Sequence, residues 1–356
     1  MKKHNFSAGP CILPESVIKK AAESVLNFNN DNLSLIEISH RSKPFVDVME
    51  KARELVKELL DIPKEYSVLF LQGGASLEFA MIPLNLMKEK NGKAAYLNTG
   101  TWAKKAIDEA KLFGETNILA DSSDKNYNYI PKGYHIPLDI DYFHCTSNNT
   151  IFGTQIKRFP TISAPLVCDM SSDIFSRKIN INQFDLIYAG AQKNMGPAGT
   201  TLVIVKNEIL GKTGRDIPKM LDYQTHINKE SMFNTPPVFA VYVSMLTLEW
   251  LQKRGGIDAI EKKNNQKANL LYEEIDRNEL FEGIAQKEDR SNMNATFILK
   301  QNKAENIFNE MCEKEGINGL KGHRSVGGYR ASMYNALPLE SVEKLINIMQ
   351  KLENKI

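Results

Sequence analysis

Residues 185–205 read DLIYAGAQKNMGPAGTTLVIV, and this stretch decides the fold class. An apolar run ends at Tyr188, a glycine-rich turn carries a single lysine, Lys193, and a second apolar run occupies 202–205. Similar short apolar runs, followed by segments of helical periodicity, recur from about residue 45 to 205. Strands that alternate with helices predict an α/β protein with a mainly parallel sheet flanked by helices.

The rest of the chain extends this pattern and then departs from it. We expect strands at 67–71, 94–97, 141–145, 165–168, 186–188 and 202–205, and helices at 46–60, from 76 onwards and at 102–113. The polar segment 121–149 predicts an irregular excursion, and helical periodicity over 238–278 is interrupted at Gly255-Gly256. A strand at 295–299 and helices at 304–315 and 339–352 follow. We predict a large domain over 15–255 and a smaller C-terminal α+β domain over 256–356, with residues 1–14 packed near the smaller one.

Bulk composition excludes several kinds of partner. Lys and Arg total 45 and Asp and Glu total 43, so the net charge of +2 gives no reason to expect nucleic acid. The longest apolar runs span about six residues, far short of the roughly 18 to 20 that a membrane-spanning helix needs. The N-terminal residues lack the apolar core of a secretory signal. We therefore expect a cytoplasmic protein without a membrane partner.

Metal and nucleotide motifs are also missing. The four cysteines form no CxxC pair and the six histidines form no HExxH motif, so we predict no metal site. The Gly-Lys-Thr triplet at 211–213 lacks the first glycine of a P-loop, and Gly73-Gly74 lacks the GxGxxG spacing. Both omissions argue against a nucleotide-binding module.

Two residues indicate a different chemistry. Lys193 stands among alanines and glycines that leave room for a flat ligand, and a lysine near apolar walls readily forms a Schiff base. Asp169 follows the run 165–168, and ligands of parallel sheets bind beyond the carboxyl ends of the strands. A pyridoxal phosphate site needs such a pair, a lysine for the aldehyde and an acid for the pyridinium nitrogen. From these residues alone, a solvated loop lysine and a helix-capping aspartate remain alternatives.

Eight motifs, spread from residue 6 to residue 332, carry a family resemblance. They are FSAGPCILP (6–14), HRSKPF (40–45), QGGAS (72–76), NTGTW (98–102), CDMSSDIFSR (168–177), YAGAQKNMGPAG (188–199), NTPP (234–237) and GHRSVGGYRAS (322–332). Together they resemble the phosphoserine aminotransferase family, a class V group within the type I fold of pyridoxal-phosphate enzymes. The resemblance covers essentially the whole chain, and it implies that fold with a large and a small domain.

The resemblance implies a role for each cofactor-site residue. Lys193 holds pyridoxal 5'-phosphate as a Schiff base, and Asp169 pairs with the ring nitrogen. The other implied contacts are ring stacking by Trp102, a hydrogen bond from Thr150 to the ring hydroxyl, and phosphate contacts by Ala75, Ser76 and Gln192, with Asn234 and Thr235 contributed by the neighbouring subunit of a homodimer. Ser76 departs from family members that carry arginine there. Without the resemblance, Trp102 could equally be a core aromatic, Thr150 a turn cap and Asn234-Thr235 a helix start.

The substrates implied by the resemblance carry two anionic groups. Arg330 binds the α-carboxylate, while His40, Arg41, His323 and Arg324 bind the distal anion, partly across the dimer. Arginine suits both phosphate and carboxylate because its planar fork binds either in bidentate fashion. The implied reaction is reversible transamination of 3-phosphohydroxypyruvate with L-glutamate to O-phospho-L-serine and 2-oxoglutarate, in serine biosynthesis. A phosphorylated four-carbon keto acid of pyridoxine synthesis remains open as a second substrate.

Other class V enzymes are the main alternative. A serine–glyoxylate aminotransferase or a cysteine desulfurase also needs the lysine and the aspartate. A desulfurase needs a cysteine nucleophile on a mobile loop, and Cys312 has no flexible Gly/Ser segment around it.

Overall fold

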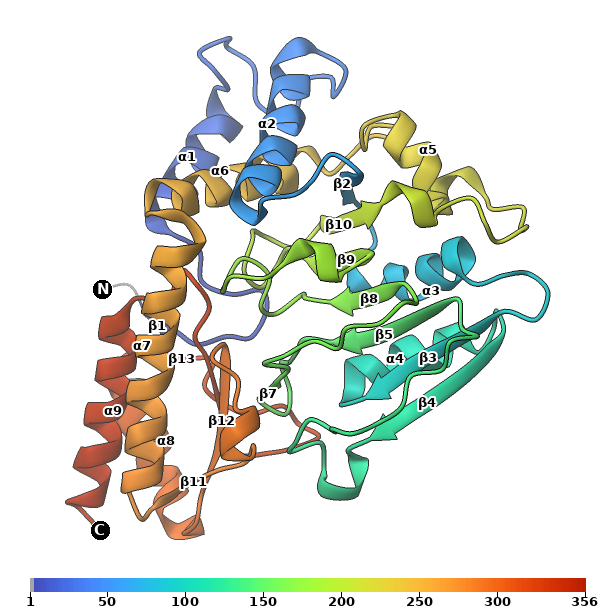
Figure 1. Ribbon diagram of the computed structural model, residues 1–356. Coiled ribbons are helices and arrows are strands. Elements are labelled where there is room, and N and C mark those ends of the chain that lie inside the picture. Colours follow the sequence, from blue (N-terminus) through green and yellow to red (C-terminus); the bar gives the residue numbers. More distant parts are fainter. Residues whose placement is uncertain (1–2) are drawn as a thin grey trace.

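A seven-stranded sheet, in the order β2-β10-β9-β8-β5-β3-β4, forms the centre of the computed structural model, which describes residues 3–356 (Figure 1). Its strands are β2 (Tyr66–Leu71), β3 (Lys93–Asn98), β4 (Glu115–Asp121), β5 (Tyr142–Thr146), β8 (Leu166–Asp169), β9 (Leu186–Gly190) and β10 (Thr201–Lys206). β10 runs antiparallel to β2 and β9, and the other neighbouring pairs are parallel. The predicted α/β class and the mainly parallel sheet are confirmed.

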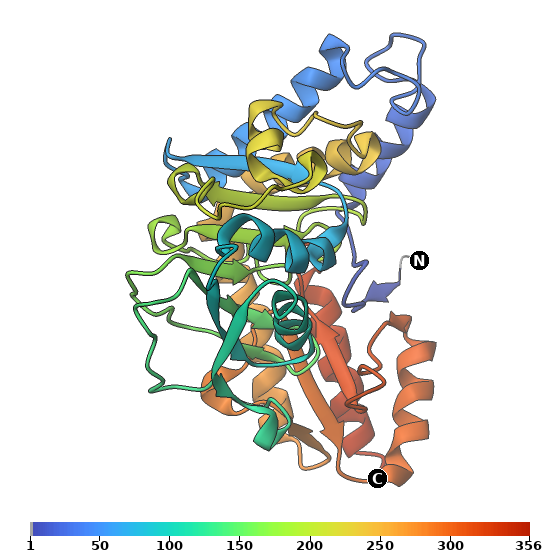
Figure 2. The same cartoon turned by 90° about the vertical axis from the view of Figure 1, so that its right-hand side faces the viewer.

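Helices cover both faces of this sheet. One face carries α3 (Gly74–Leu86) and α4 (Thr101–Ala110), which lie toward the viewer in Figure 2. The other face packs against α1 (Glu15–Leu26), α2 (Lys43–Leu60) and α6 (Val238–Lys253). Side chains of a strand point alternately to the two faces. In β2, Leu69 and Leu71 therefore join the α3 and α4 cluster, while Val68 and Phe70 join the other one.

The C-terminal part builds a second, smaller apolar core. Its antiparallel sheet consists of β11 (Phe281–Gly283), β12 (Asn294–Leu299) and β14 (Tyr329–Ser332). Three helices pack here, α7 (Gly256–Arg277), α8 (Asn302–Lys314) and α9 (Leu339–Glu353). The short strand β1 (His4–Asn5) pairs in parallel with β13 (Ile317–Asn318), so the N-terminal residues lie beside this part of the chain. The predicted domain boundary near residue 255 stays a prediction.

Most expected elements are present with small shifts at their ends. The long helical stretch divides into α6 and α7 at Gly255, which takes a positive φ of 92°. The sequence analysis did not predict α1, β4 or the short helix α5 (Tyr223–Asn228). Between residues 126 and 141 the chain has no regular helix or strand, in agreement with the expected excursion, and β5 follows it.

No helix among residues 3–356 is long and apolar enough to cross a membrane. In the same part of the chain, no three or more His, Cys, Asp or Glu side chains gather as metal ligands would. The four cysteines are free thiols, and Cys145 and Cys168 lie on neighbouring strands with their Sγ atoms 3.7 Å apart.

Helix α3 buries a carboxyl group that makes folding pH-dependent. Glu78 is fully buried, and its Oε2 accepts a hydrogen bond from the Tyr223 hydroxyl. Burial raises the pKa of Glu78 from 4.5 to about 8, and the Tyr223 hydrogen bond only partly opposes this shift. The folded state therefore holds a proton that the unfolded state has lost, and the stability that Glu78 contributes falls as the pH rises from about 4.5 to 8.

We predict that Glu78→Gln removes this loss, because glutamine is uncharged at every pH and can still accept from Tyr223. The melting temperature of the variant relative to the unmodified protein should rise steadily from pH 5 to pH 8, which thermal unfolding at several pH values measures. A melting-temperature difference that stays constant over this range would contradict the assignment.

Candidate active site

Lys193 lies in the turn after β9, where the carboxyl ends of the parallel strands meet. Its Nζ donates a hydrogen bond to Thr150 Oγ1 at 2.8 Å and lies 5.7 Å from the centroid of the Trp102 ring. Removal of the amine from water lowers its pKa from 10.5 to about 8, although the nearby Asp169 favours the charged form. The amine therefore gives up its proton, and becomes nucleophilic, more readily near neutral pH than an ordinary lysine does.

Asp169 ends β8, the strand next to β9. It is 5% exposed, and its Oδ1 accepts a hydrogen bond from the backbone N–H of Ser171 at 2.9 Å. Burial raises the pKa of this carboxyl group, while Lys193 and Ser171 act in the opposite direction. No ion pair holds Asp169 within residues 3–356, so the site offers a buried carboxylate that a ligand cation can satisfy.

A second polar layer, missed from the sequence, lies beneath Asp169. Asp173 accepts hydrogen bonds from the Ser147 hydroxyl, from Gln155 at 3.2 Å and from Arg177 at 3.0 Å. Ser147 Oγ also lies 3.0 Å from the backbone oxygen of Asp169. The motif CDMSSD contains both aspartates, but only the fold shows that the second one supports the first.

Two of the three predicted phosphate contacts of this chain lie at the start of α3. Gly73 and Gly74 take positive φ values of 92° and 67°, which lets the chain turn directly from β2 into the helix. Ala75 and Ser76 lie in the first turn of α3, which has no side-chain cap, so backbone N–H groups there are free to bind an anion. Gln192 is half-buried in the turn that carries Lys193.

Asn234 and Thr235 lie near the end of β2 in their own chain. Both are exposed, and the Thr235 carbonyl accepts a hydrogen bond from the Gln72 side chain at 2.8 Å. No contact within residues 3–356 joins either side chain to Lys193 or Asp169. Their predicted role across a dimer stays a prediction.

Four basic side chains gather near Lys193, namely Arg330, His323, Arg324 and Lys105. Arg330 donates from Nη1 to the Thr150 carbonyl at 3.4 Å, while its buried Nε has no partner among the described residues. His323 has a lowered pKa because burial disfavours its charged form and because Arg330, Arg324 and Lys105 lie nearby. None of these four side chains forms an ion pair with a carboxylate in the described part of the chain. The cluster is suited to binding an anion.

Lys105 was not predicted from the sequence. It lies one helical turn after Trp102 on α4, and its Nζ is 4.9 Å from the Trp102 ring centroid. The spacing of three residues on a predicted helix places both side chains on one face and could have indicated this cation.

His40 and Arg41 lie elsewhere, in the connection between α1 and α2 at the top of Figure 1. The buried Nε2 of His40 has no partner within residues 3–356, and Arg41 is exposed. No contact in the described part of one chain brings them to Lys193. The structure thus gathers the other predicted substrate residues but not this pair.

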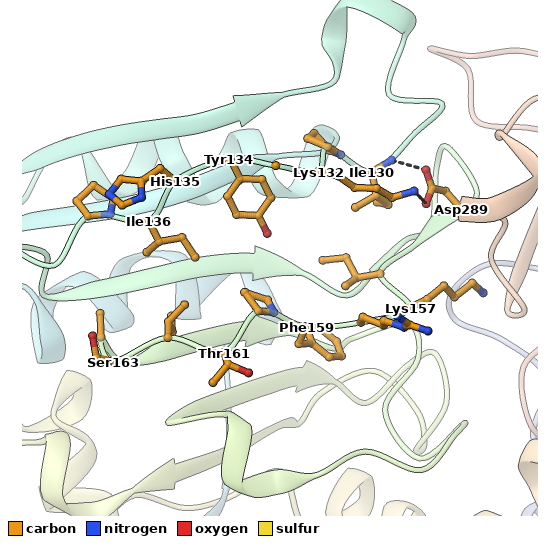
Figure 3. Close-up of a pocket in the computed structure, with 18 of the residues that line it drawn as sticks. Ile130, Lys132, Tyr134, His135, Ile136, Lys157, Phe159, Thr161, Ser163 and Asp289 are labelled. Carbon is orange, nitrogen blue, oxygen red and sulfur yellow. Dashed lines mark hydrogen bonds and ion pairs between the residues drawn. The ribbon is translucent and has the colours of Figure 1, made fainter.

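A cavity of about 960 Å³ lies apart from these residues, between the segments 130–138 and 156–164 (Figure 3). Tyr134 and Phe159 line it together with Lys132, and none of the predicted site residues does. Lys132 pairs with Glu288 at 2.8 Å and lies 3.5 Å from Asp289. Because none of the predicted site residues lines this cavity, we assign the chemistry to the Lys193 cluster instead.

Known proteins with similar sequences identify the family of this chain. The sequence profile of the Aminotransferase class-V family matches residues 3–345, so the chain belongs to this family. It is 69% identical to the phosphoserine aminotransferase of Flavobacterium psychrophilum over 357 residues, which cover 100% of both chains. Within class V, the chain belongs to the phosphoserine aminotransferases.

Solved structures agree with this placement. The phosphoserine aminotransferase of Bacillus circulans subsp. alkalophilus matches with a TM-score of 0.96 and 44% identity, over 99% of each chain. The pyridoxal-phosphate-bound phosphoserine aminotransferase of Trichomonas vaginalis matches with a TM-score of 0.93 and 37% identity, over 98% of this chain and 100% of that chain. The predicted family and the type I fold are confirmed.

Proposed function

We propose that this chain uses pyridoxal 5'-phosphate to transfer the amino group of L-glutamate to 3-phosphohydroxypyruvate, reversibly, giving 2-oxoglutarate and O-phospho-L-serine. The observation that carries the proposal is the buried Lys193 amine, held between the Trp102 ring and Thr150 close to the buried Asp169. Full-length relatives named phosphoserine aminotransferase support the choice of substrates.

The residues present fit the cofactor. Lys193 Nζ lies over the face of Trp102, so a flat ring bonded to this amine can stack on the indole. Asp169 forms no ion pair in the described part of the chain, although Lys193 lies near it, and a protonated pyridine nitrogen would supply a direct cationic partner. The uncapped N-terminus of α3 provides backbone donors for the phosphate ester.

Each side chain then has a distinct task in holding the cofactor. Lys193 would bind it covalently, Trp102 would stack on its ring, and Thr150 would hydrogen-bond its hydroxyl group. Asp169 would hold a proton on the ring nitrogen. Ala75, Ser76 and Gln192 would hold the phosphate, and Asn234 and Thr235 of a second subunit would complete that site in a homodimer.

The bound cofactor supplies an aldehyde for amine exchange and a ring that withdraws electrons from the substrate Cα. Lys193 would move the proton at the substrate Cα, since its lowered pKa leaves part of the amine unprotonated and able to accept it. Asp173 and Ser147 keep Asp169 in place during both half-reactions. The second half-reaction runs the same transfers in reverse on the phosphorylated keto acid.

The cationic cluster explains the choice of a doubly anionic substrate. Arg330, next to Thr150, is placed to bind the α-carboxylate that every substrate carries. His323 and Arg324 are placed to bind the distal phosphate or carboxylate, and Lys105 adds positive charge beside Trp102. His40 and Arg41 reach this pocket from the second subunit. A phosphorylated four-carbon keto acid remains a candidate second substrate.

The four free cysteine thiols support a cytoplasmic location for the enzyme.

Borohydride reduction of the protein loaded with pyridoxal phosphate tests the covalent assignment. Reduction should fix the cofactor to Lys193 alone, because burial keeps that amine partly neutral. Lys193→Ala should lose turnover and the tag while remaining folded, whereas the exposed Lys178→Ala should change neither. Peptide mass spectrometry locates the tag, and a tag on another lysine would refute the assignment.

Substitution of the two arginines separates the two anion sites. Loss of one guanidinium from a desolvated anion site should lower kcat/KM on the order of a hundredfold. Arg330→Ala should weaken every substrate, since all carry an α-carboxylate. Arg324→Ala should weaken glutamate and phosphohydroxypyruvate but spare alanine, and the exposed Lys321→Ala serves as the control. Equal losses for alanine and glutamate in Arg324→Ala would contradict a distal-anion role.

Hybrid dimers show which subunit's site Arg324 serves. A dimer of one Arg324→Ala subunit and one Lys193→Ala subunit retains one working lysine. If Arg324 reaches across the interface, that site receives an intact arginine and binds glutamate normally. If hybrids verified by mass show no such recovery, Arg324 serves its own subunit.

A further inference from the structure

A buried lysine outside the active site has no carboxylate partner among residues 3–356. Lys267, in the middle of α7, is 2% exposed. Its Nζ donates to the backbone carbonyls of Met333 at 2.9 Å, Tyr334 at 2.8 Å and Leu337 at 3.2 Å. An unpaired buried charge is costly, so three carbonyls are recruited to stabilise it. Lys267 therefore fixes the 333–337 segment, which joins β14 to α9.

The 333–337 segment contacts Asn194, the residue directly after Lys193. The Asn335 N–H donates to Oδ1 of Asn194, the residue after Lys193, at 2.9 Å. The Asn194 side chain in turn donates to the Ile174 carbonyl at 2.6 Å. The Asn335 side chain also donates to the carbonyl of Phe175, a buried residue with a positive φ of 59°, at 2.9 Å. A non-glycine residue keeps such a backbone conformation only when its surroundings hold it.

A second contact of the segment reaches the other side of Lys193. The Tyr334 hydroxyl donates to the Ala8 carbonyl at 2.8 Å, and it also lies within hydrogen-bonding reach of the Thr150 side chain. Thr150 is the acceptor for Lys193 Nζ. Tyr334 and Asn335 thus contact the two neighbours that hold the Lys193 side chain and backbone.

Helix α7 connects the two apolar cores. Ile257 and Ile260, in its first two turns, belong to the core of the large sheet, while Ala268 and Leu271 belong to the C-terminal core. Lys267 lies where the helix passes from one to the other. Figure 1 shows α7 running along the side of the molecule from α6 to the C-terminal sheet. Any shift of the C-terminal part therefore moves Lys267 and the segment that it holds.

We propose that Lys267 is a positioning residue for Lys193: it fixes the 333–337 segment, and through Asn335 and Tyr334 this segment holds Asn194 and Thr150 on either side of the reacting amine. The inference rests on the proposed role of Lys193. In this role, α7 helps to align the Lys193 amine with the substrate Cα. Such alignment matters because a displacement of about 1 Å can cost on the order of a hundredfold in rate.

Lys267→Met tests the proposal, with Lys263→Met as the matched control. Lys263 lies one turn earlier on the same helix and is exposed. Lys267→Met should lower kcat on the order of tenfold to a hundredfold, with a smaller change in the KM for glutamate. Amide hydrogen exchange at 333–337 should become faster in Lys267→Met, both with and without the cofactor. Lys263→Met should leave kcat and amide exchange unchanged.

Borohydride tagging separates failure of this inference from failure of the proposed function. A tag at Lys193 with a normal kcat in Lys267→Met would overturn the positioning role alone. A tag on another lysine in the unmodified enzyme would overturn the role of Lys193 itself.

Asn194→Ala breaks the same chain of contacts at its other end, so it keeps the proposal testable if Lys267→Met does not fold. It should lower kcat to a similar extent while the tag stays at Lys193, and a normal kcat would refute the proposed connection. Where both variants fold, the double variant should lose little more than the worse single variant, since both act through one path. Losses that multiply would show independent roles and overturn the proposal.

Discussion

Burial of a lysine amine and an aspartate carboxyl at one edge of the sheet is the constraint on which the site depends. Taking both groups out of water lowers the pKa of Lys193 and raises that of Asp169, so each is moved toward its neutral form. In water, both would be fully charged and the amine would be a poor nucleophile at neutral pH. The parallel pairing of β8 and β9 brings the two residues together beyond the carboxyl ends of these strands.

The surroundings of this pair divide into a rigid side and an anion-binding side. Beneath Asp169, the Ser147, Asp173 and Arg177 side chains form a hydrogen-bonded layer with little exposure. Around Arg330, by contrast, cationic groups lie without carboxylate partners in the part of the chain that the structure describes. Unpaired cations lower the stability of a folded protein. Here the proposed doubly anionic substrates would compensate this loss of stability when they bind.

Much of this arrangement could be predicted from the sequence, because it depends on local pattern. The short apolar runs before Asp169 and Lys193 indicated two strands of a mainly parallel sheet, which the structure places side by side, and the glycine-rich turn between 189 and 199 indicated space for a flat ligand. The family resemblance then added Trp102 and Thr150, which the structure places against Lys193 Nζ.

Contacts between distant segments could not be predicted in the same way. Asp173 supports Asp169 through Ser147, which lies 22 residues before Asp169 on a different strand connection, and Lys267 reaches carbonyls more than sixty residues along the chain. Neither contact leaves a periodic signal, because each depends on how the chain returns to the same place. The contacts proposed for His40 and Asn234 join two subunits, so the contacts within one chain do not reveal them.

The most direct test of this account is the rate of the first half-reaction in Asp169→Asn. An amide of the same shape keeps the hydrogen bond from Ser171 but cannot hold a proton on the ring nitrogen, while Trp102 and the phosphate contacts still bind the cofactor. Rapid mixing of the cofactor-loaded variant with glutamate, followed by absorption, measures the step before any keto acid is added. We expect a loss on the order of a hundredfold or more with the cofactor still bound. A rate close to that of the unmodified enzyme would show that Asp169 has only a structural role and would contradict the account.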